Sequence, residues 1–221
     1  MAYTYDYPHP AVTVDIVIFT IVDDDFKVLL IQRGIEPYEG MWALPGGFVG
    51  LDESLRRAAW RELKEETGVN AAFLEQLSAF GHPDRDPRER VITVAYYALI
   101  PFERLELKAS TDARKAELFS MSDLPELAFD HAKILRRAHQ KVKDKIDEPL
   151  IALQLVPESF TLTELQRVHE RILGSSIDKR NFRKRVQAQD LLELTGEERR
   201  GGPHRPAKLY RVKDPGDVPY R

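Results

Sequence analysis

Apolar residues in the first two thirds of the chain follow two spacings, one typical of strands and one typical of helices. Residues 12–22 are almost all β-branched or aromatic, which predicts a buried strand, and residues 27–32 predict the strand that returns after a turn. Residues 90–100 predict another strand. Apolar residues at helical spacing predict a helix over 53–67, and Gly68 is placed to end it. Because strands and helices mix without a regular repeat, the body is expected to be α+β or α/β.

A charged helical pattern over 129–146 leads out of this body. It stops at the turn-forming residues 147–149, of sequence Asp-Glu-Pro. We therefore place a domain boundary there, with one domain over 1–148 and a second domain over 149–221.

The second domain is predicted to contain two helices and a hairpin. Residues 161–164 have the spacing of a capping box, in which a threonine hydroxyl and a glutamate carboxylate satisfy exposed amides at the start of a helix. A second helix is predicted over 178–189, and strands over 192–195 and 207–212 flank a basic, glycine-rich tip. This order predicts a winged helix-turn-helix. The predicted fold class is therefore α+β with a C-terminal winged helix-turn-helix domain.

Composition excludes several classes of protein. The 221 residues are 43% hydrophobic and 31% charged, which excludes a wholly disordered chain and collagen. The chain has no cysteine, which excludes disulfides, thiolate metal ligands and a cysteine nucleophile. The N-terminal residues do not resemble a secretory signal, and no apolar run reaches the roughly 18 residues that a membrane span needs. We therefore expect a cytoplasmic protein without a membrane segment.

The net charge of −3 is unevenly distributed along the chain. Residues 1–150 carry 19 Lys and Arg against 26 Asp and Glu, whereas residues 151–221 carry 14 against 10. A basic segment attached to an acidic body favours a polyanionic partner for that segment. On charge alone, a solvated basic surface explains the asymmetry equally well.

The helix over 53–67 places carboxylates where a helix normally buries apolar side chains. At 100° per residue, Glu62 and Glu66 lie along the apolar stripe, with Glu65 beside them. A solvated, salt-bridged helix would carry these acids on its opposite face. Unpaired carboxylates in an apolar stripe are costly, so they require a compensating cation. Arg61 can neutralise one of them, and oxygen ligands of this kind suit Mg²⁺ or Mn²⁺ for the rest.

The segment 47–69 reads GFVGLDESLRRAAWRELKEETGV. It resembles, without a gap, the signature of the Nudix hydrolase family: glycine, five residues, glutamate, seven residues, then REUxEExGU, where U is aliphatic. The matching residues are Gly47, Glu53, Arg61, Glu62, Leu63, Glu65, Glu66, Gly68 and Val69. The resemblance implies the α/β/α Nudix fold, and hydrolysis of a nucleoside diphosphate linked to another group.

The resemblance also implies roles for individual residues. The implied metal ligands are the carboxylates of Glu62, Glu65 and Glu66 and the carbonyl oxygen of Gly46. Arg61 and Glu53 would complete the catalytic set by orienting the helix. Family members often take the general base from outside this motif, so the sequence leaves the base open.

Other residues are candidates for binding the nucleotide. The loop over 81–89 resembles the proline-containing segment of Nudix enzymes that act on ADP-ribose, and Arg85 is its candidate ligand-binding residue. Arg33 is a candidate for a phosphate. Gly46 and Gly47 allow a close approach of the backbone, and the helix N-terminus after them favours a bound phosphate.

The second domain carries candidate contacts to double-stranded DNA. On the helix over 178–189, a basic face lies opposite the apolar Phe182 and Val186. Its members are Lys179, Arg180, Arg183, Lys184 and Gln187. Cations attract phosphates, and Arg or Gln can read base edges, so this face suits the major groove. The remaining candidates are Thr163 at the first helix and Arg199, Arg200, His204 and Arg205 in the hairpin.

The two domains together resemble the NrtR family of bacterial Nudix-related transcriptional regulators. The similar runs are residues 13–20, 42–49, 124–131, 177–186 and 199–211. This resemblance implies a homodimeric repressor of NAD or sugar metabolism genes, which binds ADP-ribose or a related nucleotide and then releases operator DNA. Many members have a degraded Nudix motif and have lost hydrolysis, whereas this chain keeps every residue of it.

Two other functions compete with this one. A housekeeping ADP-ribose pyrophosphatase would use the basic segment only for dimerisation. RNA binding is weaker, because the second domain lacks an aromatic stacking platform.

Overall fold

The computed structural model describes residues 6–70, 72–106, 113–199 and 206–213. A mixed sheet has the order β3-β2-β1-β6-β5, with β4 pairing to β1 and β7 pairing to β2. Its strands are β1 (Ala11–Val22), β2 (Asp25–Arg33), β3 (Trp42–Ala43), β4 (Gly46–Phe48), β5 (Phe73–Phe80), β6 (Val91–Leu99) and β7 (Ala113–Ser120). β1 and β6 run parallel, and the other pairs are antiparallel. A short 3₁₀ turn, η1 (Phe102–Arg104), follows β6.

The strands expected over 12–22, 27–32 and 90–100 are confirmed as β1, β2 and β6. The sequence pattern did not identify β4, β5 or β7. β5 and β7 each pair with a single neighbour, so part of each strand faces water and its apolar alternation is weak. β4 has only three residues, two of them glycine.

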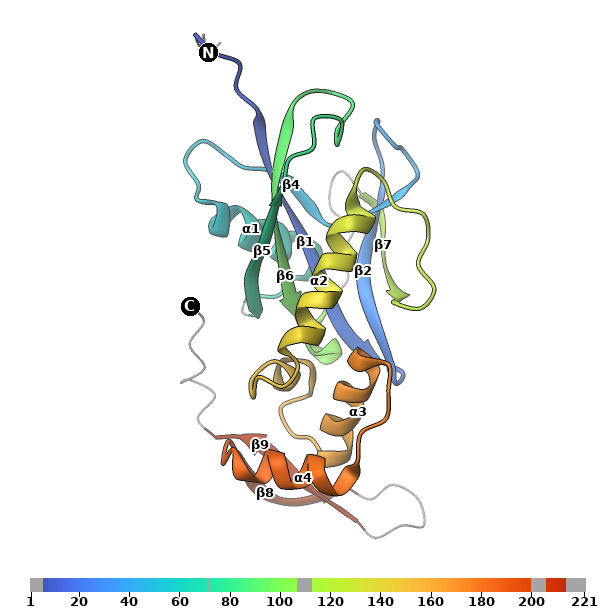
Figure 1. The fold of residues 1–221 in the computed structure, drawn as a ribbon, viewed down its shortest axis with the longest axis vertical. Coiled ribbons are helices and arrows are strands. Elements are labelled where there is room, and N and C mark those ends of the chain that lie inside the picture. Colours follow the sequence, from blue (N-terminus) through green and yellow to red (C-terminus); the bar gives the residue numbers. More distant parts are fainter. Residues whose placement is uncertain (1–5, 71, 107–112, 200–205, 214–221) are drawn as a thin grey trace.

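Helices cover both faces of the sheet. Alternate residues of β1 point to opposite faces, so Ile16 packs in the core beneath α1 (Leu55–Thr67) while Val17 packs in the core beneath α2 (His131–Lys145). Figure 1 shows α2 crossing the sheet in front of β1, β2 and β6. The α/β/α architecture expected for this domain is therefore present.

Both helices begin two residues later than the sequence predicted. The Ser54 hydroxyl accepts a hydrogen bond from the Arg57 N–H and caps α1, so Glu53 precedes the helix. Gly68 ends α1 with a left-handed φ of 68°, as expected. Phe129 has a φ of 55°, which no α-helical residue adopts, so α2 starts after it.

The C-terminal part is a winged helix-turn-helix, as expected. It contains η2 (Ala152–Leu155), α3 (Leu162–Leu173), α4 (Lys179–Ala188) and the hairpin of β8 (Leu192–Arg199) with β9 (Ala207–Val212). The capping box at Thr161 and Glu164 is formed, and the final strand has the predicted bounds. β8 is longer than the expected 192–195.

One apolar core runs from the sheet into the winged helix. Val142 and Ile146 near the end of α2 belong to the same cluster as Leu165 of α3 and Phe182 of α4. The winged helix therefore packs directly on α2, at the end of the molecule opposite β4 in Figure 1. None of the helices in the described ranges is long and apolar enough to cross a membrane.

Candidate functional site

A cavity of about 360 Å³ opens between the sheet, α1 and the start of α2. Its walls carry the predicted Arg33, Gly46, Gly47, Arg61, Glu62, Glu65, Glu66 and Arg85. It also carries residues that the sequence did not single out, among them Asp15, Phe48, Asp86, Arg88, Phe129 and His131. Of the residues expected in the nucleotide and metal site, Glu53 alone is absent from the cavity wall, and it lies behind Arg61.

The glutamates of α1 differ in burial. Glu62 is 8% exposed and Glu66 is 2% exposed, because helix pitch turns both toward the sheet. The side chain of Glu65 is 49% exposed, so it lies in the part of the cavity wall that is open to water. Burial raises the pKa of Glu62, although the hydrogen bond from Arg61 opposes this shift.

Arg61 joins α1 to the loop that precedes it. Its guanidinium donates to Glu53 at 2.8 Å, to Glu62 at 2.5 Å and to the Phe48 carbonyl oxygen at 3.1 Å. Glu53 also accepts the Gly50 N–H at 2.7 Å. Mainly because of the Arg61 hydrogen bond, the pKa of Glu53 falls to about 2. These contacts hold the loop against the helix.

Two glycines of β4 allow close contacts, one with Glu62 and one with β1. A Cβ on Gly47 would lie 2.3 Å from the Glu62 Oε1 atom, and a Cβ on Gly46 would lie 2.2 Å from the Val14 carbonyl oxygen. Any larger residue at either position would force the carboxylate or the strand to move.

Arg85 sits in the floor of the cavity between two acids. Its guanidinium donates to Asp15 at 3.2 Å and to Asp130 at 2.9 Å. The three side chains are 4%, 9% and 11% exposed. Arg85 therefore ties the loop over 81–89 to β1 and to the residue that precedes α2.

His131 extends this network. Its Nδ1 atom accepts the Leu44 N–H at 2.9 Å, so Nε2 carries the proton, and Nε2 lies 3.7 Å from Asp15 Oδ1. Burial lowers the pKa of His131, and the Nδ1 atom that accepts the Leu44 N–H carries no proton itself. A single histidine gives no sequence signal of this kind, but an aspartate inside the apolar run of β1 does.

Arginine and aromatic side chains line the mouth of the cavity. Asp86 accepts two hydrogen bonds from the Arg88 guanidinium, at 3.0 and 2.7 Å. The Arg88 guanidinium carbon lies 5.6 Å from the Phe48 ring centroid and 5.9 Å from that of Phe129. The Arg33 guanidinium carbon also contacts Phe129, at 4.8 Å from its ring centroid. Two cations and two aromatic rings therefore surround one opening.

The carboxylates suit a hard divalent cation. The donor set consists of oxygen atoms only, and Gly47 leaves room for the Glu62 carboxylate beside β4. In the described part of the chain, no three acidic or imidazole side chains are already arranged around one metal position. Arg61 instead neutralises Glu62 directly.

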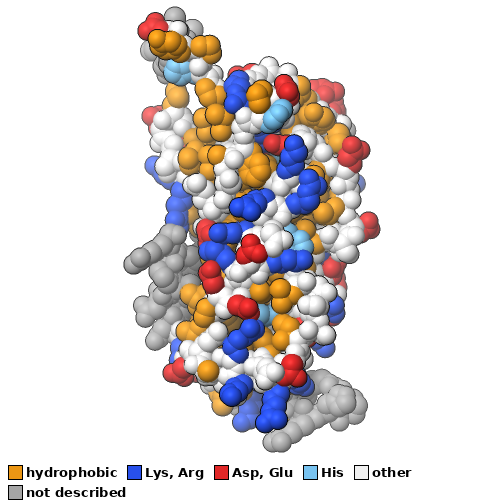
Figure 2. Space-filling view, viewed as in Figure 1, with side chains coloured by type: hydrophobic (Ala, Val, Ile, Leu, Met, Phe, Trp, Pro, Cys, Tyr) orange, Lys and Arg blue, Asp and Glu red, His pale blue; other side chains and the backbone are white. Residues whose placement is uncertain are grey.

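A second surface lies on α4. Its outer face is lined by Lys179, Arg180, Arg183, Lys184 and Gln187, as expected, together with Asp178 and Asn181. Phe182 and Val186 are buried on the opposite face. Figure 2 shows Lys and Arg side chains at this end of the molecule. Within the described ranges, none of the four basic residues of this face forms an ion pair.

The other residues predicted to contact DNA do not lie on this open face of α4. Thr163 is half-buried in the first turn of α3. Arg199 forms an ion pair with Glu164 and donates to the Ser159 carbonyl oxygen at 3.1 Å. Arg200, His204 and Arg205 lie outside the described residues.

Two families have sequence models that match this chain. The NUDIX domain matches residues 11–138, and the NrtR DNA-binding winged helix domain matches residues 152–212. The protein thus combines a Nudix domain with a DNA-binding winged helix.

Two relatives match most of the length of this chain. The chain is 40% identical over 210 residues to the "ADPR responsive transcriptional repressor NtrR" of Acinetobacter baylyi, which covers 93% of this chain and 83% of the relative. It matches the crystal structure of Shewanella oneidensis NrtR complexed with a 27mer DNA with a TM-score of 0.82 and 38% identity, covering 91% and 93% of the two chains. This chain belongs to the NrtR family. It is also 45% identical over 130 residues to the ADP-ribose pyrophosphatase of Methanocaldococcus jannaschii, covering 59% of this chain and 73% of that enzyme.

Proposed function

We propose that this protein is an ADP-ribose-responsive transcriptional repressor. Its winged helix binds double-stranded operator DNA, and its Nudix domain binds ADP-ribose or a related nucleotide. The observation that carries the proposal is the row of basic residues on α4 without acidic partners, on a domain of the NrtR DNA-binding family. The names of the Acinetobacter repressor and the Shewanella complex support both ligands. The genes under control belong, on this proposal, to NAD or sugar metabolism.

The Nudix cavity has the chemistry that a nucleoside diphosphate sugar requires. Its volume lies within the usual range for small-molecule sites. Arg33 and Arg88 at the mouth can pair with the diphosphate, and the rings of Phe48 and Phe129 can stack on a base. The relative from Methanocaldococcus jannaschii is named as a pyrophosphatase of ADP-ribose, which is a compound of this class.

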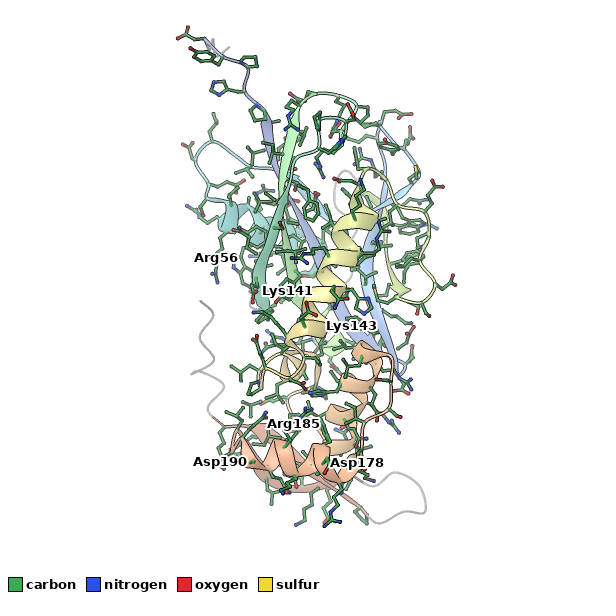
Figure 3. The ribbon with its side chains drawn as sticks, in the orientation of Figure 1. Arg56, Lys141, Lys143, Asp178, Arg185 and Asp190 are labelled. Carbon is green, nitrogen blue, oxygen red and sulfur yellow. The ribbon has the colours of Figure 1, made fainter. Side chains whose placement is uncertain are left out.

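α2 connects the cavity to the DNA-binding helix. His131 at its start lines the cavity, and Ile146 at its end lies in the core shared with α3 and α4. Just beyond α2, Asp147 pairs with Arg185 of α4 at 2.7 Å, and Figure 3 shows Arg185 on the side of α4 that faces the rest of the molecule. We propose that the repressor is a homodimer and that the nucleotide shifts α2, so that the two α4 helices no longer fit one operator.

A retained hydrolase activity is the second candidate function, because the Nudix motif is complete. The residues that would hold Mg²⁺ or Mn²⁺ are Glu62, Glu65, Glu66 and the Gly46 carbonyl oxygen. A bound ion would polarise the diphosphate and activate water. Glu66→Gln should abolish Mg²⁺-dependent hydrolysis of ADP-ribose; activity that survives would place the metal elsewhere.

The proposed repressor function is tested by measuring binding to the DNA upstream of the protein's own operon. The wild type should bind this fragment more tightly than random DNA, and both salt and ADP-ribose should weaken the complex. Arg183→Ala should abolish operator binding while the Nudix domain still binds ADP-ribose. A protein that shows no preference for the operator fragment, or does not respond to ADP-ribose, would contradict the proposal.

A further inference from the structure

The hairpin of β8 and β9, which is the wing of the winged helix, also contacts the segment at the start of α3. Phe160, just before α3, pairs with Tyr210 of β9 through two backbone hydrogen bonds of 3.0 and 2.8 Å. On the other strand of the wing, Arg199 contacts Ser159 and Glu164. The segment over 159–164 therefore holds both strands of the hairpin.

Glu164 uses both of its carboxylate oxygens. Oε2 accepts the backbone N–H of Thr161 at 2.7 Å, which closes the capping box. Oε1 accepts a hydrogen bond from the Arg199 guanidinium, whose other amino group donates to the Ser159 carbonyl oxygen. Arg199 is thus held at two points, and its charge already has a partner.

The strand ladder of the wing is irregular between its inner and outer halves. The register between β8 and β9 shifts between Leu194 and Glu198, and Gly196 has a φ of 86°. An irregularity of this kind bends the strand and disrupts the ladder locally. Arg199 lies beyond the shift, so its contact with α3 adds a tie to the outer end of β8.

The same helix also supports α4. His169 of α3 stacks edge-on against Phe182 of α4, with ring centroids 5.0 Å apart. α3 therefore contacts both α4 and the β8–β9 hairpin, so the Arg199 contact connects the hairpin to the helix that supports α4.

We infer that Arg199 is a positioning residue for the wing and that Glu164 is its partner in that role, not that Arg199 contacts a DNA phosphate. The inference rests on the proposed DNA-binding function. Both side chains are partly exposed, so the pair can bias the orientation of the wing only modestly. We expect its loss to reduce operator affinity by about three- to fivefold.

The decisive variant is Glu164→Gln. Glutamine keeps the capping box, because its amide oxygen accepts the Thr161 N–H, but it lacks the negative charge that holds Arg199. Operator affinity should fall by about three- to fivefold, while the melting temperature should fall by no more than about 2 °C. If only net charge mattered, Glu164→Gln would instead raise operator affinity, because removing an acid near DNA reduces repulsion.

Arg199→Met provides the second measurement. We expect the same loss of affinity, no further loss in the double variant with Glu164→Gln, and an unchanged dependence of binding on salt. Arg199→Lys keeps the charge but not the fork that reaches both partners, so its affinity should stay below that of the wild type. The control is Lys184→Met on the unpaired face of α4, which should lower the salt slope by about 0.9.

These outcomes separate the inference from the proposed function. If the wild type does not prefer its operator, the repressor proposal itself fails. If it does, and Glu164→Gln binds equally well or better while Arg199→Met lowers the salt slope as Lys184→Met does, Arg199 is a phosphate contact and the inference is wrong. Additive losses in the double variant would also overturn it.

Discussion

The basic side chains of the Nudix cavity and those of α4 differ in whether an acidic side chain pairs with them. In the cavity, Arg61, Arg85 and Arg88 each have an acidic partner within 3 Å. On α4, the basic residues of the outer face form no ion pair with any residue that the structure describes. The contrast separates a site built for a small molecule from a surface built for a polymer.

The difference follows from what each ligand brings. A small nucleotide contributes few contacts, so its site must be pre-organised, and acidic partners fix arginines in one geometry. DNA brings a dense row of phosphates that neutralises many cations at once, so the protein does not need partners of its own. Until DNA binds, water solvates the α4 charges, whereas buried charges in the cavity depend on each other.

The largest expected effect comes from breaking the buried set. Arg85→Leu leaves Asp15 and Asp130 without their counter-ion, and it should destabilise the fold by about 3–5 kcal/mol. At about 2–4 °C per kcal/mol, the melting temperature should fall by roughly 6–20 °C. Differential scanning fluorimetry measures this shift. A melting temperature within one degree of the wild type would show that the acids do not depend on Arg85.

The same substitution on α4 should behave differently. Arg180→Leu removes an exposed cation without an acidic partner, so the melting temperature should not fall. Operator affinity should decrease by about tenfold, and the salt slope should drop by about 0.9 if Arg180 contacts a phosphate. Fluorescence anisotropy at several salt concentrations measures both quantities. A large loss of stability in this variant would remove the contrast between the two regions.

Much of both sites could be predicted because the signals are local. Helix pitch alone places Glu62 and Glu66 on the inner side of α1, and both are buried there. The same reasoning separates the basic face of α4 from Phe182 and Val186. In each case a regular helix converts sequence spacing into position.

The remainder of the cavity depends on tertiary structure. Asp15, Arg88 and Phe129 come from three distant segments, and each is a single residue without a repeating pattern. The strand prediction for residues 12–22 rests on side chains that are almost all β-branched or aromatic, and it gives Asp15 no role. That acid is a signal in its own right, because a strand buries a carboxylate only where a partner compensates it. The partner, Arg85, is 70 residues away, so its identity could not be deduced from spacing.

The smallest expected effect concerns an ion pair that is exposed to water. It tests whether pairing or burial makes the cavity arginines important for stability. Asp24, in the β1–β2 turn, pairs with Arg171 of α3, but the two side chains are 42% and 47% exposed. The Arg171 hydrogen bond lowers the pKa of Asp24 below its ordinary value of 3.8. A lowered folded-state pKa means that the pair stabilises the protein above about pH 4, and that this contribution disappears as the pH falls through the folded-state value.

Asp24→Asn is a well-matched variant, because asparagine tolerates the left-handed φ of 59° at this position as readily as aspartate does. Near neutral pH the melting temperature should fall by only about 1–2 °C. The difference from the wild type should shrink below about pH 4 and vanish once the pH is below the folded-state pKa of Asp24. The small value is expected because this pair is exposed and the continuous apolar core already holds α3 to the sheet. A loss as large as that of Arg85→Leu would mean that pairing itself, and not burial, makes a cation structurally indispensable in this protein.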